Sequence, residues 1–495
     1  MHSFFAGVLG VFLLGMASAP AQEWQDLFDG KTLDGWRPSE RPGSFQVTNG
    51  MITCSGPRSH LFYVGPNGNA DFRNFEFSAE VMTHHGANSG IYFHTAYQRQ
   101  GWPEKGFEAQ VLNVRGGEGG YIENKLTGSL YGIRNVYKAL AKEDEWFVLN
   151  IRVQGKQIQI RVNDALVVDY TEPETAPDVP EHPGRRLDHG TFALQCHNAG
   201  SKVFFRHLRV QRLPDEPPGA GPAAAPLTEY EKDIIRLGAA NYPIVNYHVH
   251  LKGGLTIDEA LAASRQSGVF FGIAVNCGLN FQVTNDAGIY DYLHTMQGKP
   301  AFVAMQAEGR EWVQMFSREA IAGFDYVFTD AMTIVDDSGR RMRLWITNEV
   351  PEIKDKEAFM EMLVDRTVKI LNSEPIQIYV NPTFLPEAIA SEYDRLWTED
   401  RMDRVITAAA VHHIAIEINS RYQLPHLAFI QRAKAAGCKF TFGTNNADRD
   451  VGTLEYGFRM VREAGLHWQD FWTPKKVRGS KQPEGLADSS RRSQR

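Results

Sequence analysis

The sequence is poor in several features that mark particular protein classes. Only four cysteines occur in 495 residues and no two form a Cys-x-x-Cys pair, which excludes a disulfide scaffold. No internal apolar run reaches the roughly 18 residues that a membrane-spanning helix needs. The chain is mildly acidic, with 52 Lys and Arg, 59 Asp and Glu and a net charge of −7, and it has no basic stripe. Both features argue against nucleic acid as a partner.

What the sequence does contain is material for large packed cores. Apolar residues make up 43% and aromatic residues 11% of the chain, so wholesale disorder is excluded. At roughly 100–200 residues per domain, this length predicts two or three domains.

The first segment is typical of an export signal. Met1 to Gln22 contains no Lys, Arg, Asp or Glu, Phe4 to Met16 is apolar, and Ala19-Pro20-Ala21 provides small residues at a cleavage site. We therefore predict a signal peptide over residues 1–21 and a secreted or periplasmic protein without a membrane span after cleavage. An uncut anchor is the alternative.

Export would also permit disulfides. A bond between Cys54 and Cys196 is then allowed, but the spacing of these two cysteines does not by itself support it.

A linker separates two parts of different texture. Residues 214–227 are rich in Pro, Ala and Gly, a composition that continues neither a helix nor a strand. Residues 23–213 hold short alternating runs such as FEFSAEV and WFVLNIRV, which predict an all-β sandwich. Residues 228–473 alternate apolar strand-like runs with helical segments, which predicts an α/β domain with a parallel sheet. The basic tail, residues 474–495, is predicted to be disordered.

Three predicted strands of the sandwich carry large polar residues two positions apart, opposite an apolar face. These residues are Asn88, Tyr92, His94, Glu108, Gln110, Gln195 and His197. If the strands are neighbours, the set lines one sheet surface and offers sugar-binding groups together with a carboxylate and imidazoles for proton transfer. The alternative is an ordinary solvated face of an antiparallel sheet.

Several strings in this part resemble those of one family. LFDGKTLDGW, ANSGIYFHT, GFEAQVLN, LTGSLYG and FALQCHNAGSKVFFRHLRV occur in order between residues 23 and 213, and together they resemble the DUF1080 or 3-keto-disaccharide hydrolase family. The resemblance implies a concanavalin-like β-sandwich (jelly roll) that cleaves glycosides already oxidised to a ketone at C3. In that chemistry a base removes the C2 proton and the C1 substituent leaves by elimination, with net hydrolysis if water then adds.

The resemblance also implies roles for individual residues. Glu108 matches the carboxylate of the family's Gly-x-Glu-x-Gln string and is the first candidate for a base or metal ligand, and His197 is a candidate acid, base or ligand. His94 stands where the family usually has Arg, and Tyr131 is a candidate proton donor or wall. Asn88, Tyr92, Gln110 and Gln195 are predicted to bind the sugar.

In the second part, seven apolar runs with intervening helical segments predict a (β/α)7 barrel. One helix start is marked by Thr256 with Glu259 three residues on, and its end by Gly268. Functional residues of such barrels lie at strand C-terminal ends, where His248 and His250 follow the first run.

The order of strand-end residues resembles the PHP (polymerase and histidinol phosphatase) family of metal-dependent hydrolases. His248, His250, Glu308 and Asp448 are the candidate ligands for one divalent metal, zinc or manganese. The pattern departs elsewhere, because Asn276-Cys277 stands where Asp-His is expected, and amides bind these metals poorly. A barrel without metal, in which the two histidines are hydrogen-bonded to protein groups, is the alternative.

Together these features predict a multidomain, secreted carbohydrate-active enzyme acting on 3-keto-glycosides, with the PHP-like barrel as a partner domain. One alternative is a carbohydrate-binding sandwich attached to a metal-dependent PHP-like hydrolase, and another is an exported scaffold in which neither site is active. The oligomeric state is not constrained by the sequence.

Overall fold

The computed structural model describes residues 23–215, 225–336 and 338–474. The predicted signal peptide, most of the linker and the basic tail after Pro474 lie outside the described residues. Within those ranges, no helix combines the length and apolar character that crossing a bilayer requires.

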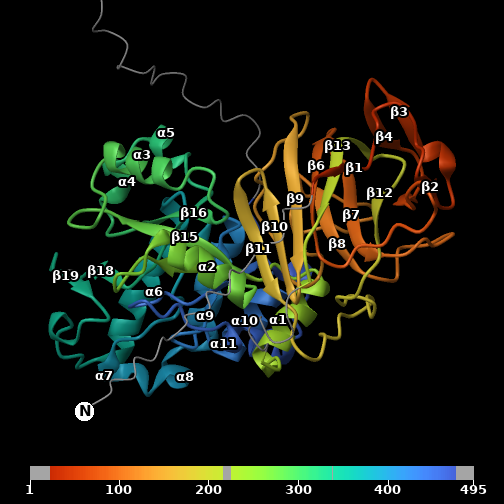
Figure 1. The fold of residues 1–495 in the computed structure, drawn as a ribbon. Coiled ribbons are helices and arrows are strands. Elements are labelled where there is room, and N and C mark those ends of the chain that lie inside the picture. The colour runs from red at the N-terminus through yellow and green to blue at the C-terminus, as the bar shows by residue number, and fades with distance from the viewer. Residues whose placement is uncertain (1–22, 216–224, 337, 475–495) are drawn as a thin grey trace, which may run out of the picture.

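The first part is a two-layer β-sandwich (Figure 1), as its alternating runs predicted. The larger sheet has the order β11-β10-β9-β6-β13-β4-β3, with β1 also pairing with β13. Its strands are β1 (Gln25–Asp26), β3 (Phe45–Thr48), β4 (Met51–Ser55), β6 (Phe75–Thr83), β9 (Phe147–Gln154), β10 (Gln157–Val162), β11 (Ala165–Thr171) and β13 (Lys202–Arg212). Buried and less buried residues alternate strictly along β9, the pattern of a sheet with one face on the core.

The smaller sheet has the order β2-β5-β12-β7-β8, all antiparallel. Its strands are β2 (Trp36–Pro38), β5 (Ser59–Tyr63), β7 (Asn88–Thr95), β8 (Phe107–Leu112) and β12 (Thr191–Cys196). A short 3₁₀ helix, η1 (Pro42–Ser44), precedes β3. Ile91, Phe93, Phe107, Val111 and Leu194 point into the core between the sheets.

The second part is a closed parallel barrel, and all seven predicted runs form its strands. In barrel order these are β14 (Val245–His250), β15 (Phe270–Cys277), β16 (Phe302–Ala307), β17 (Tyr326–Thr329), β20 (Ile378–Tyr379), β21 (Ala415–Asn419) and β22 (Phe440–Gly443). Every residue of β14 and β16 is buried, because helices cover the outside and side chains fill the inside.

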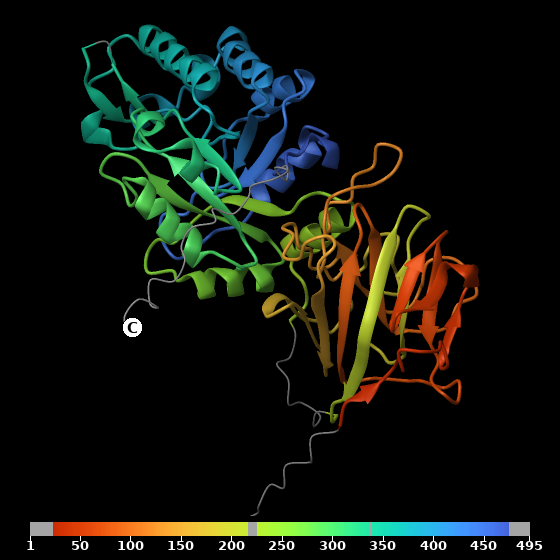
Figure 2. The same cartoon turned by 90° about the horizontal axis from the view of Figure 1, so that it is seen from above.

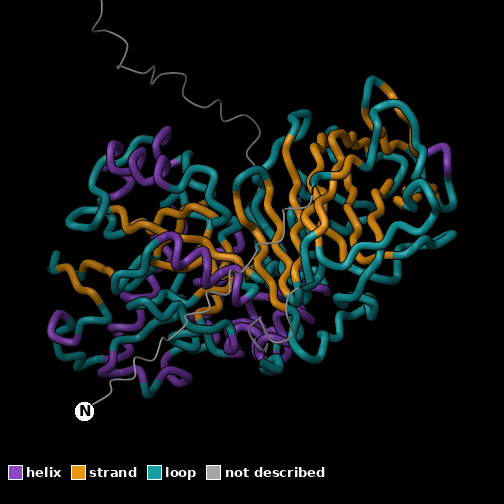
Figure 3. Tube along the Cα trace, in the orientation of Figure 1, coloured by secondary structure: helices purple, strands orange, loops and turns teal. Residues whose placement is uncertain are grey.

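Helices are confined almost entirely to this second part (Figure 3). They are α1 (Glu229–Ala239), α2 (Ile257–Ser267), α3 (Asp286–Thr295), α4 (Trp312–Met315), α5 (Arg318–Ile321), α6 (Lys356–Ser373), α7 (Glu387–Ala390), α8 (Tyr393–Leu396), α9 (Glu399–Val411), α10 (Leu427–Ala435) and α11 (Glu455–Glu463), with 3₁₀ turns η2 (Thr347–Glu349) and η3 (Trp468–Asp470). A hairpin, β18 (Thr333–Val335) with β19 (Arg341–Arg343), projects after β17. The predicted boundaries of α2 are confirmed: Thr256 and Glu259 form the capping box, and Gly268 ends the helix at φ +79°.

The two parts pack directly against each other (Figure 2). Most of their buried apolar residues belong to one contiguous cluster that includes residues of both parts. Polar contacts also cross the interface: the Tyr137 hydroxyl donates to the Tyr242 carbonyl at 3.1 Å, and Lys138 Nζ lies 2.8 Å from Asp325 Oδ2. The sandwich and the barrel therefore share a direct packed interface and are not joined by the linker alone.

All four cysteines are buried free thiols. The disulfide that export would allow between Cys54 and Cys196 is not formed; Cys196 Sγ lies 3.2 Å from the Gly56 carbonyl oxygen instead.

Candidate functional site

The polar face predicted for the smaller sheet forms the floor of an open cleft of about 1090 Å³. Figure 1 shows the three contributing strands, β12, β7 and β8, side by side. Tyr92 on β7 lies directly opposite Glu108 on β8, and Ala193 on β12 lies opposite Tyr92. Neighbouring strands with alternate side chains on one face thus bring residues about 100 positions apart into one floor.

Seven of the eight residues predicted for the sandwich site line this cleft. They are Asn88, Tyr92, Glu108, Gln110, Tyr131, Gln195 and His197.

Glu108 is the centre of the floor and is 5% exposed. Its Oε1 accepts a hydrogen bond from Gln195 Nε2 at 2.9 Å, and its Oε2 accepts one from Arg185 Nη2 at 3.2 Å. Tyr92 also hydrogen-bonds to this carboxylate. Burial raises the pKa of Glu108 above its ordinary value, and Arg185, Tyr92 and Gln195 offset part of that rise.

Gly90 in the NSG string makes room for this carboxylate. A Cβ atom at position 90 would lie 2.3 Å from Glu108 Oε1, closer than any real contact. The absence of a side chain at position 90 therefore lets the carboxylate lie flat against β7.

A second buried carboxylate, Glu123, lines another wall of the cleft. It pairs with Lys125 at 2.7 Å and accepts hydrogen bonds from the hydroxyls of Tyr131 at 2.8 Å and Tyr121 at 2.9 Å. Burial alone would raise its pKa, but the charge and hydrogen bonds of Lys125 outweigh burial and lower the pKa of Glu123 below its ordinary value. The cleft therefore holds two carboxylates in different environments, a common arrangement for acid and base roles.

The outer wall is aromatic. His197 and Trp102 pack with ring centroids 5.2 Å apart, and the Trp102 ring is 40% exposed. Burial lowers the pKa of His197, which favours neutral imidazole, and its buried Nδ1 has no hydrogen-bond partner among the described residues. An exposed indole beside a polar floor offers a flat apolar surface to a sugar ring or another cyclic substituent.

His94 is the exception, since it does not line the cleft. The pairing of β7 with β12 shifts register between Tyr92 and Thr95, and His94 adopts φ +53°, so an extra residue forms a bulge there. Its Nε2 lies 2.8 Å from the Arg73 carbonyl and its Nδ1 accepts from the Asp188 amide at 3.3 Å. Strict alternation along β7 predicts that His94 lies on the same face as Tyr92. The bulge interrupts the alternation and turns His94 away from that face.

The sequence analysis missed three residues of the cleft, Trp102, Glu123 and Arg185, and also Lys125, which pairs with Glu123. All four come from irregular segments between strands, where no periodicity shows which side chains point inward. Arg185 lies in the string HPGRR. Nothing in this string distinguishes it from Arg186, whose guanidinium donates to the Pro183 carbonyl.

The mouth of the barrel collects a second set of buried polar residues at strand ends, as predicted. His248 Nδ1 lies 2.7 Å from Glu417 Oε1. The other oxygen of Glu417 accepts from the Asn381 amide at 2.7 Å and from Asn419 Nδ2 at 3.0 Å. Gly443 is required here, because a Cβ atom would lie 1.9 Å from Glu417 Oε1.

Two more carboxylates share this mouth. Burial, and next the nearby charge of Asp330, raise the pKa of Glu308 to about 8; burial also raises the pKa of Asp330. Glu308 accepts from Asn276 Nδ2 at 2.7 Å, and Asp330 accepts from Asn381 Nδ2 at 3.2 Å.

The residues do not fit the predicted metal. Within the described part of the chain, no three His, Cys, Asp or Glu side chains converge to hold an ion. His248 Nδ1 lies on Glu417, and its other nitrogen, Nε2, lies 3.4 Å from the amide oxygen of Gln306, a poor ligand for zinc or manganese. Asp448 is exposed, and its Oδ1 accepts from the Asp450 amide at 2.8 Å. The alternative hypothesis, two histidines hydrogen-bonded to protein groups without a metal, describes His248. His250 contacts the Ala274 carbonyl through Nδ1 at 3.2 Å, and its Nε2 has no partner among the described residues.

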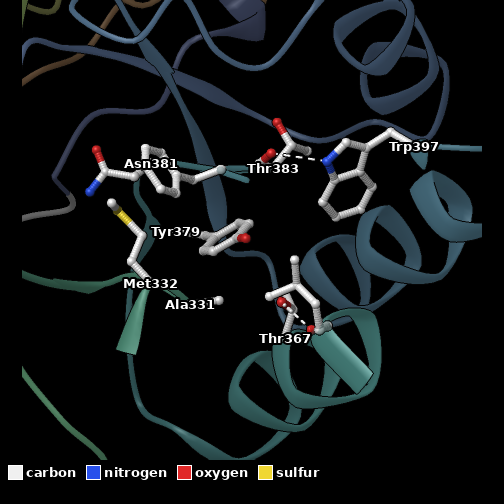
Figure 4. Close-up of a pocket in the computed structure, with 9 residues that line it drawn as sticks. Ala331, Met332, Thr367, Tyr379, Asn381, Thr383 and Trp397 are labelled. Atoms are coloured by element: carbon white, nitrogen blue, oxygen red, sulfur yellow. Dashed lines mark hydrogen bonds between the residues drawn. The ribbon is translucent and has the colours of Figure 1, made fainter. Parts of the chain in front are cut away.

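A small cavity next to the mouth does not provide a substrate site either. It is lined by Tyr379, Asn381, Thr383, Trp397 and their neighbours (Figure 4) and has a volume of about 10 Å³, room for about one water. Trp397 Nε1 donates to the Thr383 carbonyl at 2.9 Å along its edge.

Comparison with known families bears on the sandwich. Residues 23–211 match the family of 3-keto-alpha-glucoside-1,2-lyase-like domains. The lyase-like domain thus includes both sheets and the whole cleft. No curated protein matches the chain.

Solved structures give weaker likenesses. A Parabacteroides distasonis protein provisionally named a glycosyl hydrolase is 21% identical, covers 39% of this chain and 94% of its own, and has a TM-score of 0.34. The carbohydrate-binding module CBM66 from Bacillus subtilis is 14% identical, with 36% and 96% covered and a TM-score of 0.26. A Bacillus subtilis protein with a galectin-like fold is 7% identical, with 40% and 99% covered and a TM-score of 0.29. The lyase-like domain is therefore defined here by its family match and its own geometry.

Proposed function

We propose that the cleft of the lyase-like domain cleaves glycosides that carry a ketone at sugar C3. The observation that carries this proposal is the buried Glu108, surrounded by the donors Arg185, Gln195 and Tyr92. A carboxylate in this setting is a stronger base than one in water, because burial raises its pKa.

The reaction needs a proton taken from C2, which the C3 ketone makes acidic. Glu108 accepts this proton, and the electron pair of the C–H bond passes into an enolate. The pair then returns to form the C1–C2 double bond while the bond from C1 to the aglycone oxygen breaks. Addition of water across the double bond gives net hydrolysis; without it the product is that of a lyase.

The other cleft residues supply donors and shape. Arg185 is the candidate donor to the enolate oxygen, since its guanidinium already lies at the carboxylate that removes the proton. Tyr131 is the candidate to hand a proton to the leaving group, and His197, kept neutral by burial, is a candidate hydrogen-bond partner for it. Asn88 and Gln110, which hydrogen-bond to each other at 3.2 Å, present amides to sugar hydroxyls, and Trp102 offers the aglycone an apolar surface.

For the barrel we propose a PHP-like ancestry and the role of a partner domain, without the predicted metal centre. We also propose that the protein is exported, on the strength of the apolar, uncharged segment Phe4 to Met16 and the small residues after it.

The test compares two substrates with the full chain. One is a glucoside with a chromogenic aglycone oxidised at C3, and the other is the same glucoside with its C3 hydroxyl. We expect release of the aglycone from the first alone, slowed by deuterium at C2 because the C2–H bond breaks. Equal cleavage of both, or binding of the ketone without turnover, would overturn the proposal; the second outcome would favour a carbohydrate-binding sandwich.

A further inference from the structure

Asn241 belongs to the barrel part of the chain but contacts a segment of the sandwich that forms the cleft. It lies between α1 and β14, and four hydrogen bonds join it to residues 122–125. Its Oδ1 accepts from the Asn124 amide at 3.0 Å and from Lys125 Nζ at 3.2 Å. Its Nδ2 donates to the Ile122 carbonyl at 2.8 Å, and its own carbonyl accepts from Asn124 Nδ2 at 2.9 Å.

The side-chain oxygen, the side-chain nitrogen and the carbonyl of Asn241 all take part in these hydrogen bonds. Asn241 is 3% exposed, Asn124 4% and Lys125 1%, so water does not substitute for a lost bond. Asn241 also adopts φ +68°, a conformation that Asn and Gly accept more readily than other residues. Backbone shape and side chain thus both suit this one position.

The contact leads directly to the cleft. Lys125 Nζ lies between Asn241 Oδ1 and Glu123 Oε1, which is 2.7 Å away. Glu123 in turn accepts a hydrogen bond from the Tyr131 hydroxyl, and both Glu123 and Tyr131 line the cleft. One chain of hydrogen bonds therefore runs from the barrel to the cleft wall.

A second barrel residue supports the same segment. The rings of Tyr121 and Trp468 meet edge to face with centroids 5.5 Å apart, and the Tyr121 hydroxyl donates to Glu123 Oε2 at 2.9 Å. Arg115, before this segment, donates to the Pro474 carbonyl at 3.0 Å. The segment from residue 115 to 125 is thus held at three places, by Asn241 and Trp468 of the barrel and by Pro474 directly after it.

We propose that Asn241 is a positioning residue for the cleft: through Lys125 it fixes Glu123 and Tyr131, so that the barrel completes the site of the lyase-like domain. This inference rests on the proposed function, since it assigns the cleft a catalytic role. It also gives the barrel a task that needs no chemistry of its own.

One other interface contact, that of Lys138, does not reach the cleft and provides a control. Lys138 Nζ donates to the Ala301 carbonyl at 3.0 Å and pairs with Asp325, yet neither Lys138 nor Asp325 lines the cleft. A Lys138→Met variant therefore weakens the interface without touching the bonds from Asn241 to Glu123.

The experiment uses three variants in the full chain: Asn241→Gly, Asn241→Asp and Lys138→Met. Gly keeps the backbone conformation and removes the side chain, whereas Asp keeps an oxygen that accepts from Lys125. We expect Asn241→Gly to lower kcat for the 3-keto-glucoside at least about tenfold and to change the pH profile of kcat/KM. Asn241→Asp keeps the bond to Lys125 but loses the donor to the Ile122 carbonyl, so it should recover part of kcat. Lys138→Met lowers the melting temperature with kcat unchanged.

A second readout does not depend on activity. Reductive methylation followed by peptide mass spectrometry measures the accessibility of Lys125, which is protected in the natural protein by its burial. We expect Asn241→Gly, and not Lys138→Met, to expose it.

The two readouts separate the two proposals. An inactive natural protein whose Lys125 becomes reactive only in Asn241→Gly would refute the proposed function and keep the positioning role. Unchanged kcat and a protected Lys125 in Asn241→Gly, in an active protein, would refute the positioning role. Equal losses of kcat in Asn241→Gly and Lys138→Met would also refute it, because general loosening of the interface would then suffice.

Discussion

The sharpest prediction concerns Glu108→Gln. The substitution keeps the size of the side chain and one oxygen for Gln195, but it removes the group that accepts the C2 proton. It also removes the negative partner of Arg185, whose side chain is 3% exposed. Two separate losses are therefore expected, one in activity and one in stability.

Each loss has a magnitude. A positioned general base contributes about 10²- to 10⁴-fold to the rate, so kcat/KM for a 3-keto-glucoside should fall by that factor. Leaving a buried charge without its partner costs about 3–5 kcal/mol of folding free energy. Initial-rate assays and denaturant unfolding measure the two quantities independently.

A second variant separates the two losses. In Glu108→Gln with Arg185→Met the buried unpaired charge is gone, so much of the stability should return, whereas activity should stay lost. If Glu108→Gln folds and retains near-natural turnover, Glu108 is not the base and the mechanism fails. If the double variant regains activity along with stability, the loss in the single variant was structural.

Further predictions concern both parts of the chain. Because the pKa of Glu108 is raised and the base must be ionised, kcat/KM should be lost as pH falls through a value above 4.5, the ordinary pKa of Glu; an acid limb below 4.5 would contradict this. Trp102→Ala should raise KM with little change in melting temperature, because the ring is 40% exposed; unchanged KM would exclude Trp102 from the substrate surface. His94→Gln should reduce stability by about 1–3 kcal/mol while kcat falls far less than in Glu108→Gln, and an equal fall in kcat would return His94 to the site. Glu417→Gln should lower the melting temperature of the chain, because His248 loses its carboxylate partner; calorimetry that shows no change would mean that this pair contributes no stability.

The proposed role of Asn241 gives a structural reason for joining a domain with its own cleft to a barrel. The strands of the smaller sheet hold the floor rigidly, but the wall with Glu123 comes from an irregular segment whose polar groups must be satisfied elsewhere. Asn241 satisfies several of them. In this view the barrel contributes structure to the site in the sandwich, as an external support for a loop.

The sequence alone determined the strands and the faces of most strand residues. Side chains alternate between the two faces of any strand. This period alone predicts that Tyr92, Glu108, Gln110 and Gln195 lie on one face of the sheet. Continuous apolar runs similarly identified the seven barrel strands, since strands buried on both faces have little polar content.

Only the tertiary structure decided the rest of the site. Trp102, Glu123 and Arg185 come from segments without a period, and their direction depends on packing against distant residues such as Asn241. The bulge at His94 inserts one residue and breaks the alternation locally. At the barrel mouth, sequence order brought His248 to a strand end, but the partner that occupies it, Glu417, lies 169 residues away in the chain. Spacing along a strand is a local property, whereas the hydrogen-bond partner of a side chain is set by whatever the fold brings beside it.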